Sequence, residues 1–194
     1  MLKSKIALIY GGVGQNGYLL SKFLLKKNYK IYSVIKKNNK DRFDKRINYV
    51  KINIQNYKLI YDLIKNIKPD EIYNFLGPSD KIPFEKSASY YFKRDFLCNL
   101  NTLESVRQLG FKTKIFYSSS SEVFGSRKRI VKEESPRLIL NNYALTKNIN
   151  ETLINYYRKF YNINACYGIL FNHDSKFRKD KFIYKILYNY FKIK

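Results

Sequence analysis

A short apolar segment near the start of the chain runs directly into a turn that contains three glycines. Residues 5–10 have the length and composition of a strand, and Gly11, Gly14 and Gly17 follow at intervals of three. Apolar residues at helical spacing then continue to about residue 27. A strand, a glycine turn and a helix in this order are typical of the first unit of a parallel α/β sheet. This feature limits the possible folds more than any other.

The rest of the chain repeats the alternation of strand-like and helix-like segments. Strands are expected at 30–35, 48–52, 71–76, 114–118 and 165–171, and helices at 57–67, 86–109, 143–160 and 181–192. Alternation over this length predicts the α/β class, with a Rossmann-like, doubly wound parallel sheet and right-handed crossovers. We expect one dinucleotide-binding domain over residues 1–194, with a substrate-binding region beginning near residue 175.

The glycine turn predicts a place for a dinucleotide. The second glycine lets the backbone approach a pyrophosphate, and the N-terminus of the following helix favours its negative charge. The alternative is a plain turn between strand and helix. After the second strand come Lys36 and Lys37, with no acidic residue before Asp41. A cation at this point accommodates a 2′-phosphate, which favours NADP over NAD, unless these are ordinary solvated lysines.

Four side chains form the strongest candidate for a catalytic site. Ser120 and Glu122 lie where the fifth strand ends, and Tyr143 and Lys147 follow about two dozen residues later at the start of a helix. A Tyr and a Lys four apart share one helix face. An ammonium beside a phenol favours the phenolate, which is the form that accepts a proton. The set therefore predicts a hydride-transfer site, although Glu122 alone would also fit a surface carboxylate or a helix cap.

The charge of the chain is strongly positive, with a formal net charge of +23 over 194 residues. The lysines are spread along the chain, and Lys, Asn, Ile and Tyr are abundant together, a bias that AT-rich codons would produce. We therefore expect no nucleic-acid partner, while an attraction for anionic ligands stays open.

Other residue types exclude several classes of protein. No apolar run is long enough to span a bilayer, and no signal-peptide cleavage site precedes the glycine turn, so a cytoplasmic protein is expected. Cys98 and Cys166 have no metal-ligand spacing and are expected to be buried free thiols. The single histidine, His173, cannot anchor a zinc site alone, so no metal is predicted.

With these motifs in view, the chain resembles the extended short-chain dehydrogenase/reductase family, and within it the GDP-mannose 4,6-dehydratases. The resemblance extends over essentially the whole chain. It is carried by residues 7–17, which include the unusual Gln15, and by residues 69–74, 121–125 and 168–173. The last segment, Gly-Ile-Leu-Phe-Asn-His, is the most specific to these dehydratases.

The resemblance implies a lyase that converts GDP-mannose to GDP-4-keto-6-deoxymannose through a transient hydride cycle on NADP. Tyr143, assisted by Lys147, would take the proton of the C4 hydroxyl, and Ser120, where the family has Thr, would hold that hydroxyl. Glu122 would act as the base at C5. The cofactor-binding residues implied are Gly11, Gly14, Gln15, Gly17, Lys36, Asn53, Ile54, Tyr143, Lys147, Asn172 and His173.

The chain also departs from the family. Tyr10, Asn16, Asn53 and residues 78–80 differ from the usual residues, and Lys36 replaces an arginine, which keeps the charge but loses the bidentate fork. We expect a C-terminally shortened form that lacks most of the substrate pocket, so its activity is open, and a homo-oligomer or a complementing chain as partner. The apolar stretch 184–191 would then expose an apolar patch. The alternatives are another nucleotide-sugar epimerase or reductase, and a non-catalytic dinucleotide-binding module.

Overall fold

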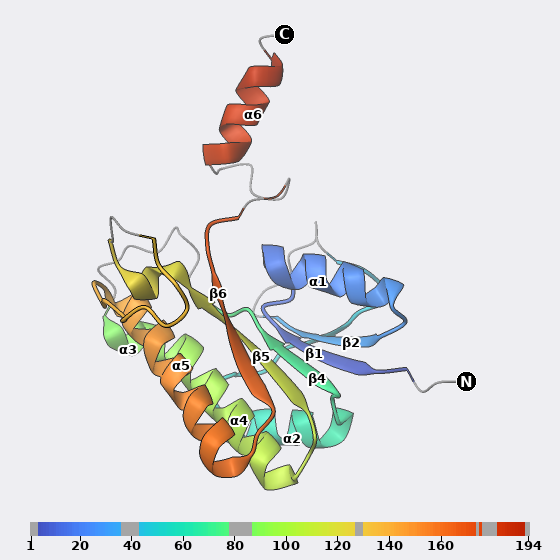
Figure 1. The fold of residues 1–194 in the computed structure, drawn as a ribbon. Coiled ribbons are helices and arrows are strands. Elements are labelled where there is room, and N and C mark those ends of the chain that lie inside the picture. The colour runs from blue at the N-terminus through green and yellow to red at the C-terminus, as the bar shows by residue number, and fades with distance from the viewer. Residues whose placement is uncertain are drawn as a thin grey trace.

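The computed structural model describes residues 4–35, 43–77, 87–126, 130–173, 175 and 182–192. Its elements alternate along the chain as expected (Figure 1). The strands are β1 (Ile6–Tyr10), β2 (Lys30–Val34), β3 (Asn48–Val50), β4 (Glu71–Asn74), β5 (Lys114–Ser120) and β6 (Ala165–Leu170). The helices are α1 (Gln15–Lys26), α2 (Tyr57–Ile67), α3 (Ala88–Tyr91), α4 (Leu97–Leu109), α5 (Asn142–Tyr161) and α6 (Phe182–Lys192), with a π-helical turn η2 (Phe92–Phe96) and a 3₁₀ turn η3 (Ser121–Phe124).

All six strands form one parallel sheet in the order β3-β2-β1-β4-β5-β6. The order reverses between β1 and β4, and a doubly wound sheet binds its ligands at such a switch point, beyond the carboxyl ends of the strands. The sequence prediction of a Rossmann-like sheet is therefore confirmed. The last residues of the strands, among them Tyr10, Asn74 and Ser120, lie along this one edge.

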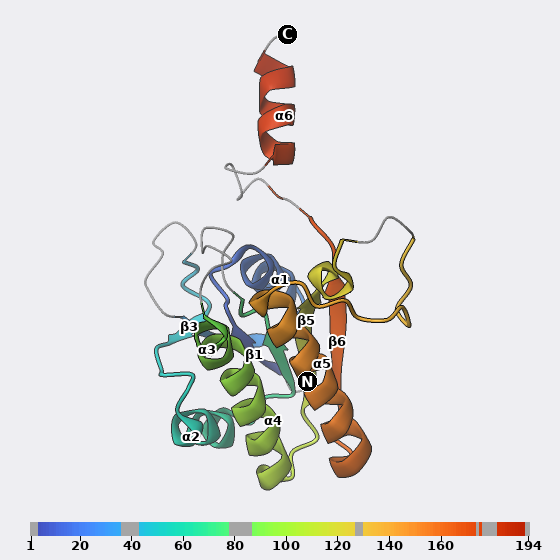
Figure 2. The ribbon, with the colours of Figure 1, turned by 90° about the vertical axis from the view of Figure 1, so that its left-hand side faces the viewer.

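Helices cover both faces of the sheet. Helices α2, α4 and α5 lie on one face and α1 lies on the other (Figures 1 and 2). The larger core cluster includes Leu8, Ile64 and Ile154 among its fully buried side chains, and the smaller one places Leu24 of α1 against Ala7 and Ile9. Two layers of buried apolar side chains around one sheet hold the strand ends, and so the site, in place.

Two expectations about buried residues are wrong. The helical spacing of Leu153, Ile154, Tyr157 and Phe160 predicts that all four lie on the inner face of the helix over 143–160. Phe160 is instead 61% exposed, because the inner face ends with Ile154 and Tyr157. Cys166 was expected to be a buried thiol, but it is exposed, while Cys98 is buried. Successive strand residues point to opposite faces, and Ala165 is buried on the side where α5 packs, so Cys166 points to the other side of the sheet.

Helix α6 stands apart from the sheet (Figures 1 and 2). Its side chains Ile186, Leu187, Tyr188, Tyr190 and Phe191 are all about half exposed or more, as the apolar stretch 184–191 predicts.

Among the described residues, no helix is both long and apolar enough to cross a membrane. The separate substrate region from about residue 175 stays a prediction.

A charged cluster joins α4 to α5 and gives the fold a specific acid sensitivity. Glu104 accepts hydrogen bonds from Arg107, at 2.6 and 2.8 Å, and from the Tyr157 hydroxyl at 2.9 Å. The Arg107 guanidinium is the largest cause that lowers the pKa of Glu104 from 4.5 to about 2. Ionised Glu104 therefore stabilises the folded state above pH 4.5, and this contribution is lost as the pH falls towards 2.

The Glu104→Gln variant is expected to lose less stability on acidification than the parent protein. Because the carboxylate is partly open to solvent, we expect a difference of about 1 kcal/mol rather than the full linkage value. Urea unfolding at about pH 5 and about pH 3 measures it. Equal acid sensitivity of the two proteins would contradict this role for Glu104.

Candidate active site

The β1–α1 turn is built so that only glycine fits at its key positions. Gly11 has a φ of +79°, which side chains rarely adopt. A Cβ on Gly17 would lie 2.4 Å from the carbonyl oxygen of Gly11 and 2.7 Å from the Cα of Gly12, both backbone atoms. Gly14 is the N-cap of α1 and supplies no side-chain cap to its first turn. The turn thus leads into a helix N-terminus through glycines rather than through a capping side chain, which fits a pyrophosphate.

The segment after β6 is hydrogen-bonded to this helix N-terminus. The Gln15 side chain donates to the His173 carbonyl oxygen at 3.2 Å and accepts from the Ser175 hydroxyl at 2.9 Å. The Asn16 Oδ1 and the His173 Nε2 lie 2.8 Å apart. The structure therefore brings the glycine turn, Gln15 and His173 together. Gln15 and His173 are 158 positions apart in the sequence.

The end of β5 carries Ser120 and Glu122. Ser120 is the N-cap of η3, and its Oγ accepts a hydrogen bond from the Glu122 backbone amide at 3.3 Å. The Glu122 side chain is exposed, and its Oε2 accepts from the Asn141 side-chain amide at 3.4 Å. Asn141 also caps α5 by accepting from the Ala144 amide at 2.7 Å. One residue therefore links the start of α5 to the Glu122 carboxylate.

Tyr143 and Lys147 occupy the first two turns of α5. Tyr143 is partly exposed, whereas Lys147 is only 1% exposed. The Lys147 Nζ lies 5.5 Å from the centroid of the Tyr143 ring. A Cβ on Gly77, just beyond β4, would lie 3.7 Å from the Lys147 Nζ and 3.9 Å from the Tyr143 ring. The phenol thus lies at the carboxyl edge of the sheet, above a buried ammonium.

The partner of that ammonium is a residue that the sequence analysis missed. The Lys147 Nζ makes an ion pair with Asp95 Oδ2 at 2.9 Å and donates to the carbonyl oxygens of Ser118 at 2.8 Å and Leu76 at 3.0 Å. Asp95 lies in η2, is 1% exposed, and accepts from the Tyr117 hydroxyl at 2.9 Å. Burial raises the pKa of the Asp95 carboxyl, and Lys147 and Tyr117 offset part of this rise.

A sequence signal for Asp95 existed in the helical periodicity. Tyr91, Asp95, Cys98 and Thr102 follow a spacing of four, three and four, and all are buried. A carboxylate on the inner side of a helix is rarely left without a cation. Which lysine or arginine serves it depends on how α5 packs against this helix, and periodicity does not reveal that.

A second, partly buried ion pair fixes the loop that leads to α5. The Arg137 Nε donates to Glu151 Oε2 at 2.9 Å, and the other oxygen of Glu151 accepts from the Ser119 hydroxyl. The Arg137 guanidinium also lies 4.8 Å from the centroid of the Phe124 ring. The loop is thereby tied to both β5 and α5.

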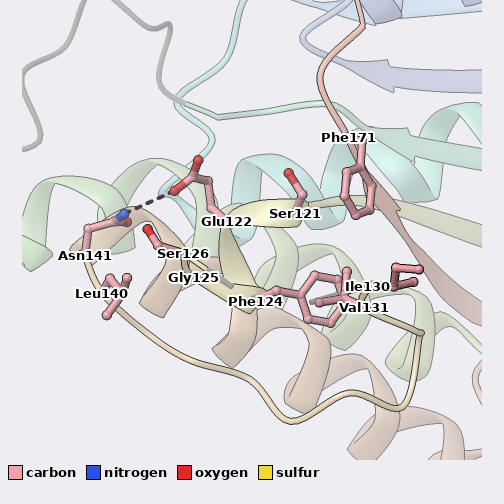
Figure 3. A pocket seen from close by; sticks show the side chains of 10 residues that line it. All are labelled: Ser121, Glu122, Phe124, Gly125, Ser126, Ile130, Val131, Leu140, Asn141 and Phe171. Atoms are coloured by element: carbon pink, nitrogen blue, oxygen red, sulfur yellow. Dashed lines mark hydrogen bonds between the residues drawn. The ribbon is translucent and has the colours of Figure 1, made fainter. Parts of the chain in front are cut away.

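An open pocket of about 620 Å³ lies beside Glu122. Glu122 and Asn141 lie at one side of it, and the Phe124 and Phe171 rings, 6.4 Å apart between centroids, lie at the other (Figure 3). The pocket thus combines a carboxylate with apolar walls. Its full lining is Ser121, Glu122, Phe124, Gly125, Ser126, Ile130, Val131, Leu140, Asn141 and Phe171.

The remaining predicted cofactor residues lie at other points. Lys36 and Lys37 are outside the described residues. Asn53 and Ile54 lie between β3 and α2, where the Asn53 side chain accepts from the Gln55 amide at 3.0 Å, and Asn172 is exposed after β6. Their roles stay predictions. Among the described residues, no group of three or more His, Cys, Asp or Glu side chains is placed to hold a metal ion.

A glycine turn at the switch point of this sheet, with a Tyr and a Lys on α5, defines a dinucleotide-binding domain of the short-chain dehydrogenase/reductase type. Solved structures share the fold. UDP-glucose 4-epimerase from Brucella ovis in complex with NAD has a TM-score of 0.78 at 18% identity, over 87% of this chain and 52% of that one. L-threonine dehydrogenase from Clostridium difficile also has a TM-score of 0.78, at 19% identity, over 86% of this chain and 53% of that one.

Sequence comparisons give the family. The model of the GDP-mannose 4,6 dehydratase family matches residues 8–194, so the chain belongs to this family. It is 33% identical to GDP-mannose 4,6-dehydratase of Vibrio cholerae, over 94% of this chain and 53% of the relative. It is 34% identical to GDP-mannose 4,6 dehydratase 2 of Arabidopsis thaliana, over 92% of this chain and 53% of the relative. The chain thus spans about half the length of the curated relatives it matches.

Proposed function

We propose that this chain carries the cofactor-binding and catalytic half of an NADP-dependent nucleotide-sugar 4,6-dehydratase that acts on GDP-mannose. The observation that carries the proposal is the position of Tyr143 and Lys147 at the carboxyl edge of the sheet, in a chain that belongs to the dehydratase family. The relatives named as dehydratases support the substrate, and the excess of positive charge favours an anionic one.

The turn formed by Gly11, Gly14 and Gly17 would hold the dinucleotide pyrophosphate at the N-terminus of α1, with Gln15 and His173 beside it. A bound nicotinamide would accept a hydride from C4 of the sugar and return it to C6. The preference for NADP over NAD rests on Lys36 and Lys37 in the sequence.

The side chains of the protein would move the protons. The Tyr143 phenolate takes the proton of the C4 hydroxyl, and Ser120 holds that hydroxyl by a hydrogen bond. The Glu122 carboxylate then takes the proton from C5 and gives it to the C6 hydroxyl, which leaves as water. When the hydride returns to C6, C5 takes up one proton, which balances the proton held by Tyr143. The product is GDP-4-keto-6-deoxymannose, and each positioned acid or base contributes roughly 10²–10⁴-fold to the rate.

Two other functions remain candidates. An epimerase or reductase of nucleotide sugars would use the same Tyr143 and Lys147, and the epimerase structures share the fold. The exposed carboxylate of Glu122 favours the dehydratase, because an epimerase needs no elimination across C5 and C6. A non-catalytic module that only binds dinucleotides would need none of these groups.

GDP-mannose with deuterium at C4 distinguishes these functions. The dehydratase is expected to lose one water from the sugar and to carry the deuterium at C6 of the product. An epimerase or reductase would give a product without loss of water. If the protein binds NADP but leaves the labelled sugar unchanged, while a full-length relative converts it under the same conditions, the proposed activity of this chain is wrong.

A further inference from the structure

The ion pair between Asp95 and Lys147 is an expensive arrangement for a protein interior. The two side chains are 1% and 2% exposed, and within the part of the chain that the structure describes, the Asp95 Oδ1 has no hydrogen-bond partner. Buried charges lose their hydration, and an apolar pair of similar volume is often as stable or more stable. Stability alone therefore does not account for these two residues.

The backbone that carries Asp95 is also unusual. Asp95 lies in η2, a π-helical turn of five residues between α3 and α4. Such turns are rare and occur often at functional sites, because they change the direction in which a side chain points. Here the turn carries a carboxylate that reaches the lysine of α5.

The contacts of Lys147 leave its ammonium no freedom. An ammonium has three N–H donors, and here they meet three acceptors, of which two are backbone carbonyl oxygens. The Asp95 carboxylate is the one acceptor of these three that carries a charge. The titratable or charged groups around the pair are Tyr117 on β5, Tyr143 on α5, Tyr91 on α3, and Arg94 and Cys98 next to Asp95.

We propose that Asp95 is a positioning residue that acts through Lys147. Its carboxylate holds the ammonium in place beneath the Tyr143 ring. Without this counter-ion, the ammonium would no longer be held there, and Tyr143 would lose the nearby positive charge that favours its phenolate. The importance of this effect for turnover rests on the proposed function, but the effect itself needs neither substrate nor cofactor.

The ionisation of Tyr143 measures the proposal directly. It is obtained as the difference in ultraviolet absorbance, during an alkaline titration, between each protein and the same protein with Tyr143→Phe. Asp95→Asn is expected to move this ionisation to higher pH by about one unit, as Lys147→Met does, which is a tenfold change in the ionisation constant. In the Lys147→Met background, Asp95→Asn is expected to cause no further change.

Two variants separate this role from a structural one. Asp95→Glu keeps the charge and is expected to retain the ionisation of Tyr143. Asp44→Asn breaks a different ion pair, with Lys22 and Arg46, and should leave it unchanged. If Asp95→Asn alone does not fold, the ionisation of Tyr143 in the Asp95→Asn/Lys147→Met protein is compared with that in the Asp95→Glu protein. The proposal would be overturned if Asp95→Asn left the ionisation of Tyr143 unchanged. It would also be overturned if Asp95→Asn changed this ionisation equally in the Lys147→Met background. Failure of the dehydratase activity would appear only in the labelled-sugar assay.

Discussion

Replacing Gly17 with valine is expected to abolish dinucleotide binding. Even the first carbon of the new side chain would lie 2.4 Å from the Gly11 carbonyl oxygen and 2.7 Å from the Gly12 Cα. Because both are backbone atoms, α1 must move away from β1, and the helix N-terminus no longer faces the pyrophosphate position. Titration calorimetry with NADP is expected to give an affinity at least 100-fold weaker, which corresponds to about 2.7 kcal/mol.

The control is a glycine whose replacement strains the protein elsewhere. Gly110 ends α4 with a φ of +64°, and a Cβ there would meet no atom of the described residues within 4 Å. Gly110→Ala is expected to lower stability by about 1 kcal/mol and to leave NADP binding intact. Equal NADP affinities of the Gly17→Val and parent proteins would mean that the dinucleotide does not bind at this turn.

Replacing Tyr143 with phenylalanine is expected to reduce turnover of GDP-mannose by 10²–10⁴-fold. The change removes only the hydroxyl, and the ring that lies near Tyr91 and above Lys147 is retained. NADP affinity is therefore expected to stay within a few-fold of the parent value. Steady-state rates and calorimetry on the same preparations measure the two effects separately.

The neighbouring ring offers a matched control. Tyr91 lies 6.3 Å from Tyr143 between ring centroids and is 2% exposed. Tyr91→Phe makes the same chemical change one ring away and is expected to leave the rate within a few-fold. A Tyr143→Phe protein that turns over as fast as Tyr91→Phe would exclude Tyr143 as the proton acceptor.

The fold was largely predictable because its signals are local. The glycine turn and the alternation of strands and helices each depend on neighbouring residues. Local patterns predicted the ends of the strands less accurately. The third strand ends at Val50 rather than at residue 52, and the fifth continues to Ser120 rather than ending at residue 118. This extension makes Ser120 the last residue of β5.

The electrostatic core of the site depends on contacts between distant segments. Lys147 and Asp95 are 52 positions apart and meet only because α5 packs against η2. The same limit explains the errors at Phe160 and Cys166, since a periodic pattern identifies a side of a helix or strand but not what covers it. The contact of Gln15 with His173 also depends on the path of the chain after β6.

The most direct test of the site is the distance between a bound nicotinamide ring and Tyr143. With NADP bound, nuclear Overhauser effects are expected between the nicotinamide ring protons and one tyrosine ring. In the Tyr143→Phe protein the same effects should connect the nicotinamide to a phenylalanine ring and no longer to a tyrosine ring. Contacts of the nicotinamide with other residues only, in a protein that still binds NADP, would contradict the assignment of this edge of the sheet as a hydride-transfer site.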